Sequence, residues 1–238
     1  MLYLLLVAHL LGDYLFQWDA LARWKYRSVW GVVAHGGIVT VTTLICAALV
    51  DPAWWPYALL IGVLHTVIDV VRAIILHPQS PTSAWLLLLL DQALHLGIIV
   101  GLVLWTAAPH QPDFSPLFSL LSDSRLLPFM IGYLILLHPA WVLLRFTARG
   151  LWGESVPPLG QGEKYAPMVE RVLMATLAVL GLFYLIPLTL LPRRLLPVRV
   201  QSNGMLVMLH LTAHWGETLL SVTLATLVGV ILRVISVF

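Results

Sequence analysis

Three short motifs place a histidine and an aspartate four residues apart inside strongly apolar stretches of the sequence. They are His9 with Asp13, His65 with Asp69 and, in reverse order, Asp91 with His95. Four residues make about one helical turn, so each pair projects from one helix face. An ionisable side chain inside a bilayer is costly and is by default a candidate functional residue. The sequence therefore predicts that these pairs form a functional site.

Imidazole and carboxylate groups are ligands of zinc, manganese and iron. A bound cation would also neutralise carboxylates that stand alone in an apolar interior. The sequence therefore predicts a divalent metal ion, held by side chains from the three pairs and the second helix. The candidate ligands are His9, Asp13, His35, His65, Asp69, Asp91 and His95. One ion with further carboxylates around it and a two-metal site are both compatible with this set.

Two other interpretations of the pairs stay open. An intramembrane histidine or aspartate often serves only as a hydrogen-bond partner between helices. A layer of such groups can also carry a proton or an ion across the membrane.

Composition indicates a membrane protein of many spans. The chain has 238 residues, of which 60% are hydrophobic and 10% charged, whereas soluble domains carry about 25% charged residues. Cys46 is the only cysteine, which excludes a disulfide within the chain and a cysteine-based zinc site. No basic tract predicts a nucleic-acid partner, and the sequence does not indicate an oligomeric state.

The apolar runs predict an all-α bundle of about seven transmembrane helices. Counting about 20 apolar residues per span, the helices fall at about 2–17, 30–50, 57–76, 84–106, 126–145, 165–191 and 205–232. We expect one integral membrane domain over 1–238. It would comprise a four-helix half with the polar core (1–107), an outer loop (108–125) and a three-helix half (126–238). Ser83 is the predicted cap of the fourth helix.

The positive-inside rule predicts an outer N-terminus and an inner C-terminus. This orientation places most basic residues inside, namely Arg23, Lys25, Arg27, Arg72, Arg145, Arg149, Lys164 and Arg233, although the cluster from Arg193 to Arg199 falls outside. Because the fourth helix runs opposite to the first and third, the reversed pair keeps its groups level with the others. The aspartates and His35 would lie about 6–10 Å from the inner ends, with the other histidines one turn deeper.

Further polar residues extend this prediction. Glu170 and Arg171 fall near the depth of the aspartates. Either the two side chains neutralise each other, or Glu170 is a further ligand or general base and Arg171 anchors an anionic group. Gln17 and Gln92 are predicted to orient the pairs. In the last helix His210, His214 and Glu217 share a face, and we expect Glu217 to pair with an arginine.

The function predicted first is that of a metal-dependent hydrolase. Its substrate would be a membrane lipid or another membrane-embedded molecule, attacked from the cytoplasmic side by a water whose pKa the metal lowers. The candidate catalytic residues are Asp13, Asp69, Asp91, Glu170 and Arg171. The alternatives are a transporter coupled to protons or divalent ions, and a structural or assembly subunit without chemistry.

The motifs resemble those of a known family. The stretch His9-Leu10-Leu11-Gly12-Asp13, the pair His65 and Asp69, and Asp91-Gln92 with His95 resemble domain-of-unknown-function family 3307, found in bacteria and phages. Val169-Glu170-Arg171-Val172-Leu173 and Glu217-Thr218-Leu219-Leu220 are similar to a second block of that family. The resemblance implies a multi-spanning protein of the bacterial inner membrane. The sequence also has a fainter similarity to membrane-bound metal-dependent hydrolases. It lacks that group's Pro-Asp-x-Asp-His and His-Arg-x-x-Thr-His-Ser stretches.

Overall fold

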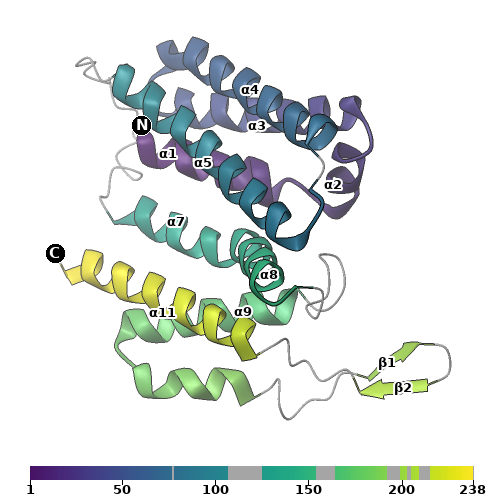
Figure 1. The fold of residues 1–238 in the computed structure, drawn as a ribbon. Coiled ribbons are helices and arrows are strands. Elements are labelled where there is room, and N and C mark those ends of the chain that lie inside the picture. The colour runs from purple at the N-terminus through teal and green to yellow at the C-terminus, as the bar shows by residue number, and fades with distance from the viewer. Residues whose placement is uncertain are drawn as a thin grey trace. The chain divides into compact units, whose positions relative to one another are not determined.

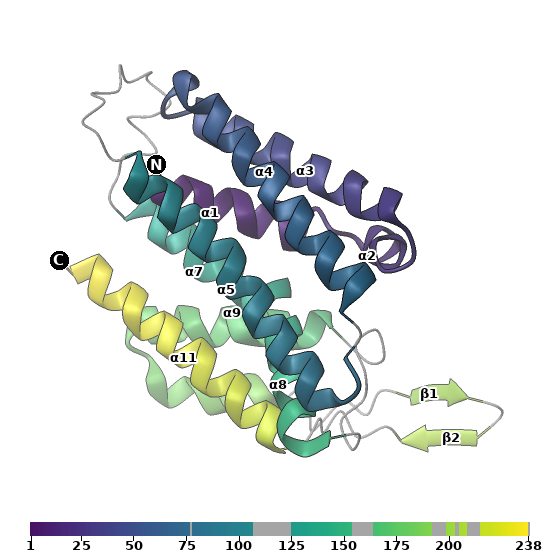
Figure 2. The same ribbon diagram turned by 45° about the horizontal axis from the view of Figure 1, so that its top comes forward.

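The computed structural model of the chain describes residues 1–76, 78–106, 125–153, 164–191, 199–202, 205–208 and 215–237. The chain divides into two compact units, Met1–Ile135 and Leu136–Phe238. Figures 1 and 2 show the described part to be helical apart from one short hairpin.

The first unit consists of helices joined by short turns. Its elements are α1 (Leu2–Leu10) with the π-helical turn Leu11–Leu15, α2 (Asp19–Lys25), α3 (Val29–Ala48), the 3-10 turn Pro52–Trp54, α4 (Trp55–Val70) with the π-helical turn Val71–Ile75, α5 (Pro81–Trp105) and α7 (Leu126–Leu136). Side chains cap two of these helices. The Ser28 hydroxyl accepts a hydrogen bond from the Trp30 amide at 3.2 Å, and Ser80 forms a capping box with Ser83. Ser80, not Ser83, is therefore the cap of α5, because the helix begins at Pro81, a residue suited to the first turn.

Small residues set the spacing between α3 and α4, which lie side by side (Figure 2). A Cβ at Gly36 would collide with the Thr66 side chain, and one at Gly62 would collide with Thr40. The hydroxyls of Thr40 and Thr66 donate back to the carbonyls of Gly36 and Gly62 at 2.7 and 2.8 Å, so each hydroxyl is hydrogen-bonded within its own helix at the contact. Two reciprocal glycine contacts thus bring the helix axes close together.

An apolar core fills the part of the first unit nearest the N-terminus. Leu5, Ala47, Ala58, Ile61 and Ile99 are buried against one another, and they come from α1, α3, α4 and α5. Burial of this kind, at about 25 cal/mol per Å² of apolar surface, fixes the four helices relative to one another. The polar side chains discussed below lie further along the same helices.

The second unit contains three helices, a 3-10 segment and a hairpin. Its elements are α8 (His138–Trp152), α9 (Tyr165–Leu180), the 3-10 segment Phe183–Leu190, the antiparallel strands β1 (Arg199–Ser202) and β2 (Met205–Met208), and α11 (Trp215–Val237). α9 and α11 pack together at Gly229, where a Cβ would meet Ala175 and Ala178. Met174 and Ala225 belong to the same core.

Three predicted helices differ from the observed ones. The helix expected at 126–145 is two helices, α7 and α8, bent by 44° just before Pro139, whose ring removes a backbone donor. The helix expected at 165–191 ends at Leu180, because Gly181 takes a left-handed conformation with φ of 79°. The helix expected from residue 205 begins at Trp215, and residues 205–208 form a strand instead.

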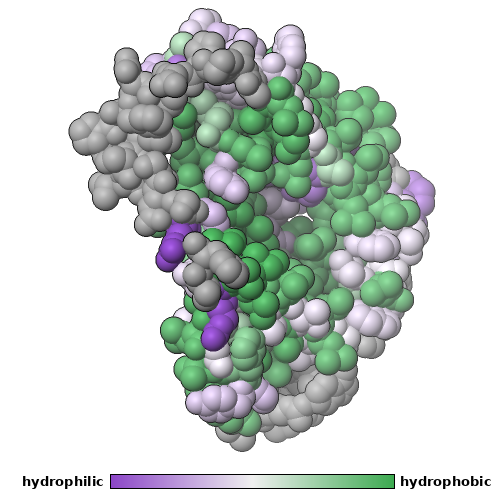
Figure 3. All heavy atoms as spheres, turned by 90° about the vertical axis from the view of Figure 1, so that its left-hand side faces the viewer, coloured by the Kyte–Doolittle hydropathy of each residue, from purple (hydrophilic) through white to green (hydrophobic). Residues whose placement is uncertain are grey.

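Several helices are long and apolar enough to cross a membrane. Within the described residues these are Val29–Ala48, Pro52–Ile75, Pro81–Trp105 and Gly216–Ser236, and the bent pair of α7 and α8 would be a fifth. Leu2–Leu15 is apolar but shorter. Large apolar side chains such as Trp30, Leu104 and Trp105 point outward, and Figure 3 shows apolar surface over much of one face. The chain is a helical membrane protein, whereas seven spans and the N-out orientation remain predictions.

The close approach of α3 and α4 can be tested at two adjacent glycines. Gly36→Leu should destabilise the protein by about 1–3 kcal/mol, as overpacking of a filled contact does, because the new side chain must displace Thr66. Gly37→Leu is the matched control, since a Cβ there meets nothing within 4 Å. Thermal unfolding in detergent measures both variants. Equal loss of stability in the two would contradict the packing described.

Candidate metal centre

Four polar side chains from three segments of the first unit converge on one point. Asp13 comes from the π-helical turn after α1, His35 from α3, and His65 and Asp69 from adjacent turns of α4. All four are buried, and their potential ligand atoms lie within 4.8 Å of one another.

The distances between these atoms match a four-ligand metal site. Nε2 of His35 lies 3.0 Å from Oδ1 of Asp13 and 3.5 Å from Oδ2 of Asp69. Nε2 of His65 lies 3.2 Å from Oδ2 of Asp69, 3.8 Å from Oδ1 of Asp13 and 3.3 Å from Nε2 of His35. An ion held tetrahedrally at about 2.0–2.2 Å separates its ligands by about 3.3–3.6 Å. The side chains could hold one small divalent cation with little movement.

Local backbone geometry places these atoms. A π-helical turn contains one extra residue relative to the α-helix and often occurs at functional sites; here it is closed by the bond from the Phe16 amide to the Leu11 carbonyl at 2.7 Å. Asp13 lies within this turn, and a Cβ at the adjacent Gly12 would press against Val39 of α3. The turn thus brings the Asp13 carboxylate up to His35 across a close helix contact.

Lys25 at the end of α2 supplies a positive charge to the cluster. Its ammonium lies 2.8 Å from Oδ2 of Asp69 and 3.9 Å from Oδ1 of Asp13, and it donates to Oε1 of Gln17 at 3.4 Å. Burial disfavours the charged form of this lysine, but the carboxylates of Asp69 and Asp13 outweigh that cost and raise the pKa of Lys25. Lys25 therefore stays charged beside the two carboxylates.

A second group of ligand atoms adjoins the first and shares Asp69 with it. Atoms of Asp69, Asp91 and His95 lie within 4.8 Å of one another, and all three side chains are buried. Arg72, in the π-helical turn after α4, donates to Oδ2 of Asp91 at 2.6 Å. Two like-charged carboxylates are thus held near each other with a fixed cation beside each of them.

Gln92 and His9 complete the polar network. The Gln92 amide donates to Oδ2 of Asp13 at 3.3 Å and to Oδ2 of Asp91 at 3.0 Å, and its oxygen lies 3.4 Å from Nε2 of His9. Gln92 therefore contacts members of every predicted motif except that of α4, whereas Gln17 contacts Lys25. His9 stacks on His95 with 5.7 Å between ring centroids, so it borders the cluster rather than joining either group of ligand atoms.

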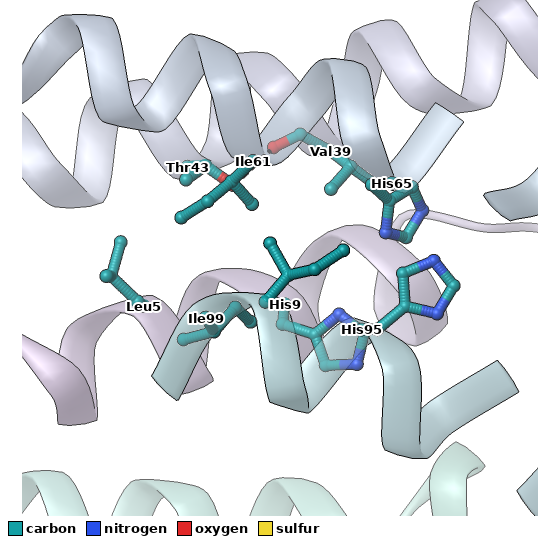
Figure 4. A pocket seen from close by; sticks show the side chains of 9 residues that line it. Leu5, His9, Val39, Thr43, Ile61, His65, His95 and Ile99 are labelled. Carbon is teal, nitrogen blue, oxygen red and sulfur yellow. Dashed lines mark hydrogen bonds between the residues drawn. The ribbon is translucent and has the colours of Figure 1, made fainter. Parts of the chain in front are cut away.

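A small cavity borders the cluster among the described residues. A cavity of about 10 Å³ lies among apolar residues, His9, His65 and His95, which is about the space of a single water molecule. Figure 4 shows His65 and His95 at one end of this cavity and Leu5 toward the other.

The predicted site residues fall in two places. The seven predicted ligands all gather in the first unit, as described above, whereas Glu170 and Arg171 lie on α9 in the second unit. Arg171 donates to the carbonyls of Leu136 and Leu137 at 2.8 and 3.3 Å, where the chain bends between α7 and α8. Catalytic roles for these residues remain predictions.

The other predictions for the second unit have separate outcomes. Glu217 pairs with Arg145 at 3.3 Å, which confirms the expected partner type. His210 and His214 lie outside the described residues.

Sequence reasoning missed the roles of Lys25 and Arg72. Both were assigned to the inner ends of helices because lysine and arginine favour those positions. The missed signal is charge, because buried carboxylates need cations close by. Basic residues follow the inner end of the first predicted helix (Arg23, Lys25 and Arg27) and lie in the last part of the third (Arg72).

The arrangement defines a class of protein: a helical membrane protein with a buried cluster of histidines and aspartates between its N-terminal helices. The chain belongs to the family described as a protein of unknown function (DUF3307), whose sequence model matches residues 1–121. That range contains the whole cluster. Neither a curated protein nor a solved structure matches the chain.

The role of Lys25 can be tested by removing its charge. Lys25→Met should destabilise the protein by about 3–5 kcal/mol, the usual cost of leaving a buried charge without its partner, because Asp69 and Asp13 lose their ammonium. Arg23→Met on the exposed side of the same helix is the control and should change little. Thermal unfolding in metal-free detergent measures both. A Lys25→Met variant as stable as the control would contradict this charge pairing.

Proposed function

We propose that this protein binds one divalent cation of the zinc class between Asp13, His35, His65 and Asp69. The observation that carries the proposal is the spacing of the four ligand atoms, from 3.0 to 3.8 Å over the distances given above. Such spacing is close to the edge length of a tetrahedral zinc site.

The chemistry of the ligands supports zinc first. Two imidazoles and two carboxylates in tetrahedral arrangement suit zinc, whereas manganese usually takes more oxygen ligands in an octahedral arrangement. Iron sites with two histidines and one carboxylate keep positions open, and here a fourth side chain occupies one of them. Zinc, manganese and iron are all to be tested, with zinc expected to bind most tightly.

The proposed setting is the bacterial inner membrane, with the N-terminus outside, the C-terminus inside and about seven spans. The support is the distribution of lysine and arginine in the sequence and the apolar helices of the structure. Seven spans would include Leu2–Leu15 and the segment beginning with α9, both shorter than a full crossing helix. On this orientation the metal site lies near the cytoplasmic side.

The geometry supports metal binding, but it does not extend to the more specific function of a hydrolase that acts on a membrane lipid or membrane-embedded substrate. A catalytic metal needs a coordination position open to water, and here four side chains surround the proposed ion. The adjoining cavity of about 10 Å³ leaves no room for a lipid headgroup. Hydrolysis would require the helices to separate, so metal binding is the better supported function.

A transporter coupled to protons or divalent ions remains the second candidate. It is favoured by the adjoining group of Asp69, Asp91 and His95, because an ion in transit needs successive sets of ligands. A structural or assembly subunit is the outcome if the protein binds no metal.

The metal prediction has a direct test. The purified protein, stripped with a chelator and titrated with zinc, should bind about one equivalent. Asp69→Asn should weaken binding more than about 100-fold, since losing outer-sphere partners alone costs 10–100-fold. His138→Ala, which removes an imidazole in the second unit, is the control and should bind normally. Calorimetry measures the affinities, and wild-type protein that binds no zinc, manganese or iron would overturn the proposal.

A further inference from the structure

Asp69, Asp91 and His95 carry ligand atoms that no neighbour uses. All three side chains are more than nine-tenths buried, with exposed fractions of 1%, 4% and 3%. Within the described part of the chain, Oδ1 of Asp69, Oδ1 of Asp91 and Nε2 of His95 have no hydrogen-bond partner. Buried polar atoms are nearly always paired, so an unpaired atom on each of three neighbouring residues requires an explanation. One potential ligand atom from each of these residues lies within 4.8 Å of the others.

The tautomer of His95 follows from its hydrogen bond. Nδ1 lies 2.8 Å from the main-chain carbonyl oxygen of Asp91, and since a carbonyl can only accept, Nδ1 carries the proton. Nε2 of the neutral ring therefore presents a lone pair. Metal-binding histidines are usually held in this way, with the second ring nitrogen donating to a carbonyl or carboxylate.

The Asp91 carboxylate is likewise oriented through one oxygen. Arg72 and Gln92 both donate to Oδ2, at 2.6 and 3.0 Å, and Oδ1 is left with its lone pairs. Arg72 thus fixes the direction of the carboxylate without occupying its second oxygen. Neither Arg72 nor Lys25 contacts Nε2 of His95 among the contacts described for them.

The charges of the cluster limit how many cations it can hold. Asp13, Asp69 and Asp91 face two fixed cations, Lys25 and Arg72, which leaves one net negative charge with the imidazoles neutral. One divalent ion changes this to one net positive charge, and two would give three. Because the cost of burying charge rises steeply with its magnitude, two ions at once are strongly disfavoured.

We propose that Asp69, Asp91 and His95 form a second position for the divalent ion, which the ion occupies alternately with the first. This inference rests on the proposed function and extends it. The potential ligand atoms of the second position lie within 4.8 Å of one another, and we expect its affinity to be lower than that of the first position. It has three protein ligands instead of four.

The carboxylate of Asp69, which both positions share, would let the ion move from one position to the other. An ion that moves from His35 and His65 toward His95 can keep its bond to Asp69 throughout. It is therefore never stripped of all ligands inside an apolar interior, where an unpaired cation is most costly. The rings of His65 and His95 lie 4.1 Å apart between centroids, so the distance to be moved is short.

Cobalt(II) in place of zinc tests this inference, because its visible absorption reports coordination number. Wild-type protein should bind one equivalent with the intense bands of a four-coordinate site. His35→Ala should still bind one equivalent, at least about 10-fold more weakly and with the weaker bands of a higher-coordinate ion. His95→Ala should bind nearly as wild type does, and the double variant His35→Ala with His95→Ala should bind none.

Each contrary result has a separate meaning. A folded His35→Ala variant that binds no cobalt would overturn the second position and leave the first intact. Two equivalents in wild-type protein would overturn alternate occupancy. No binding in wild-type protein would overturn the proposed function itself. If His35→Ala does not fold, Asp13→Asn replaces it, because it removes a first-position ligand at nearly constant volume, and the same outcomes apply.

Discussion

Three carboxylates buried between apolar helices are the constraint on which the first unit depends. An unpaired carboxylate in such surroundings would cost several kcal/mol or more and would take up a proton instead. The structure brings a cation to each region of the cluster: Lys25 lies beside Asp69 and Asp13, and Arg72 beside Asp91. Imidazoles and one amide fill the remaining positions, so charge pairing organises the polar part of the interface between the helices.

This pairing depends on backbone features that look unrelated to it. The glycine contacts between α3 and α4 allow His35 and His65 to approach within 3.3 Å. The two π-helical turns carry Asp13 and Arg72. Each turn contains one residue more than an α-helical turn, and in an α-helix one residue corresponds to a rotation of about 100° about the axis. Without the extra residue these side chains would point in a different direction from the cluster. Close packing and local underwinding of the helices thus set the distances on which any metal chemistry depends.

The membrane character of the chain and the grouping of its histidines and aspartates could be predicted from the sequence. Both depend on simple periodicities: an apolar run of span length, and the one-turn spacing of His65 and Asp69. The position of His35 level with the aspartates also agrees with prediction, since it lies 3.0 Å from Asp13.

The partners of these groups could not be predicted in the same way. Lys25 reaches the cluster because α2 folds back after Trp18, and no periodicity encodes that turn. The bend before Pro139 and the helix end at Gly181 depend on local backbone choices that an apolar run does not reveal. The strand pair Arg199–Ser202 and Met205–Met208 could not be predicted for a similar reason, because a short apolar sequence such as Met205–Met208 suits a strand as well as a helix.

X-ray absorption spectroscopy of the zinc-loaded protein tests the central claim most directly, because it counts the ligands of the bound ion and measures their distances. The account predicts four nitrogen and oxygen neighbours at about 2.0–2.2 Å, with the outer-shell scattering of two imidazoles. A shell of six oxygens without imidazole scattering would contradict it, since the ion would then be bound outside the histidine and aspartate cluster.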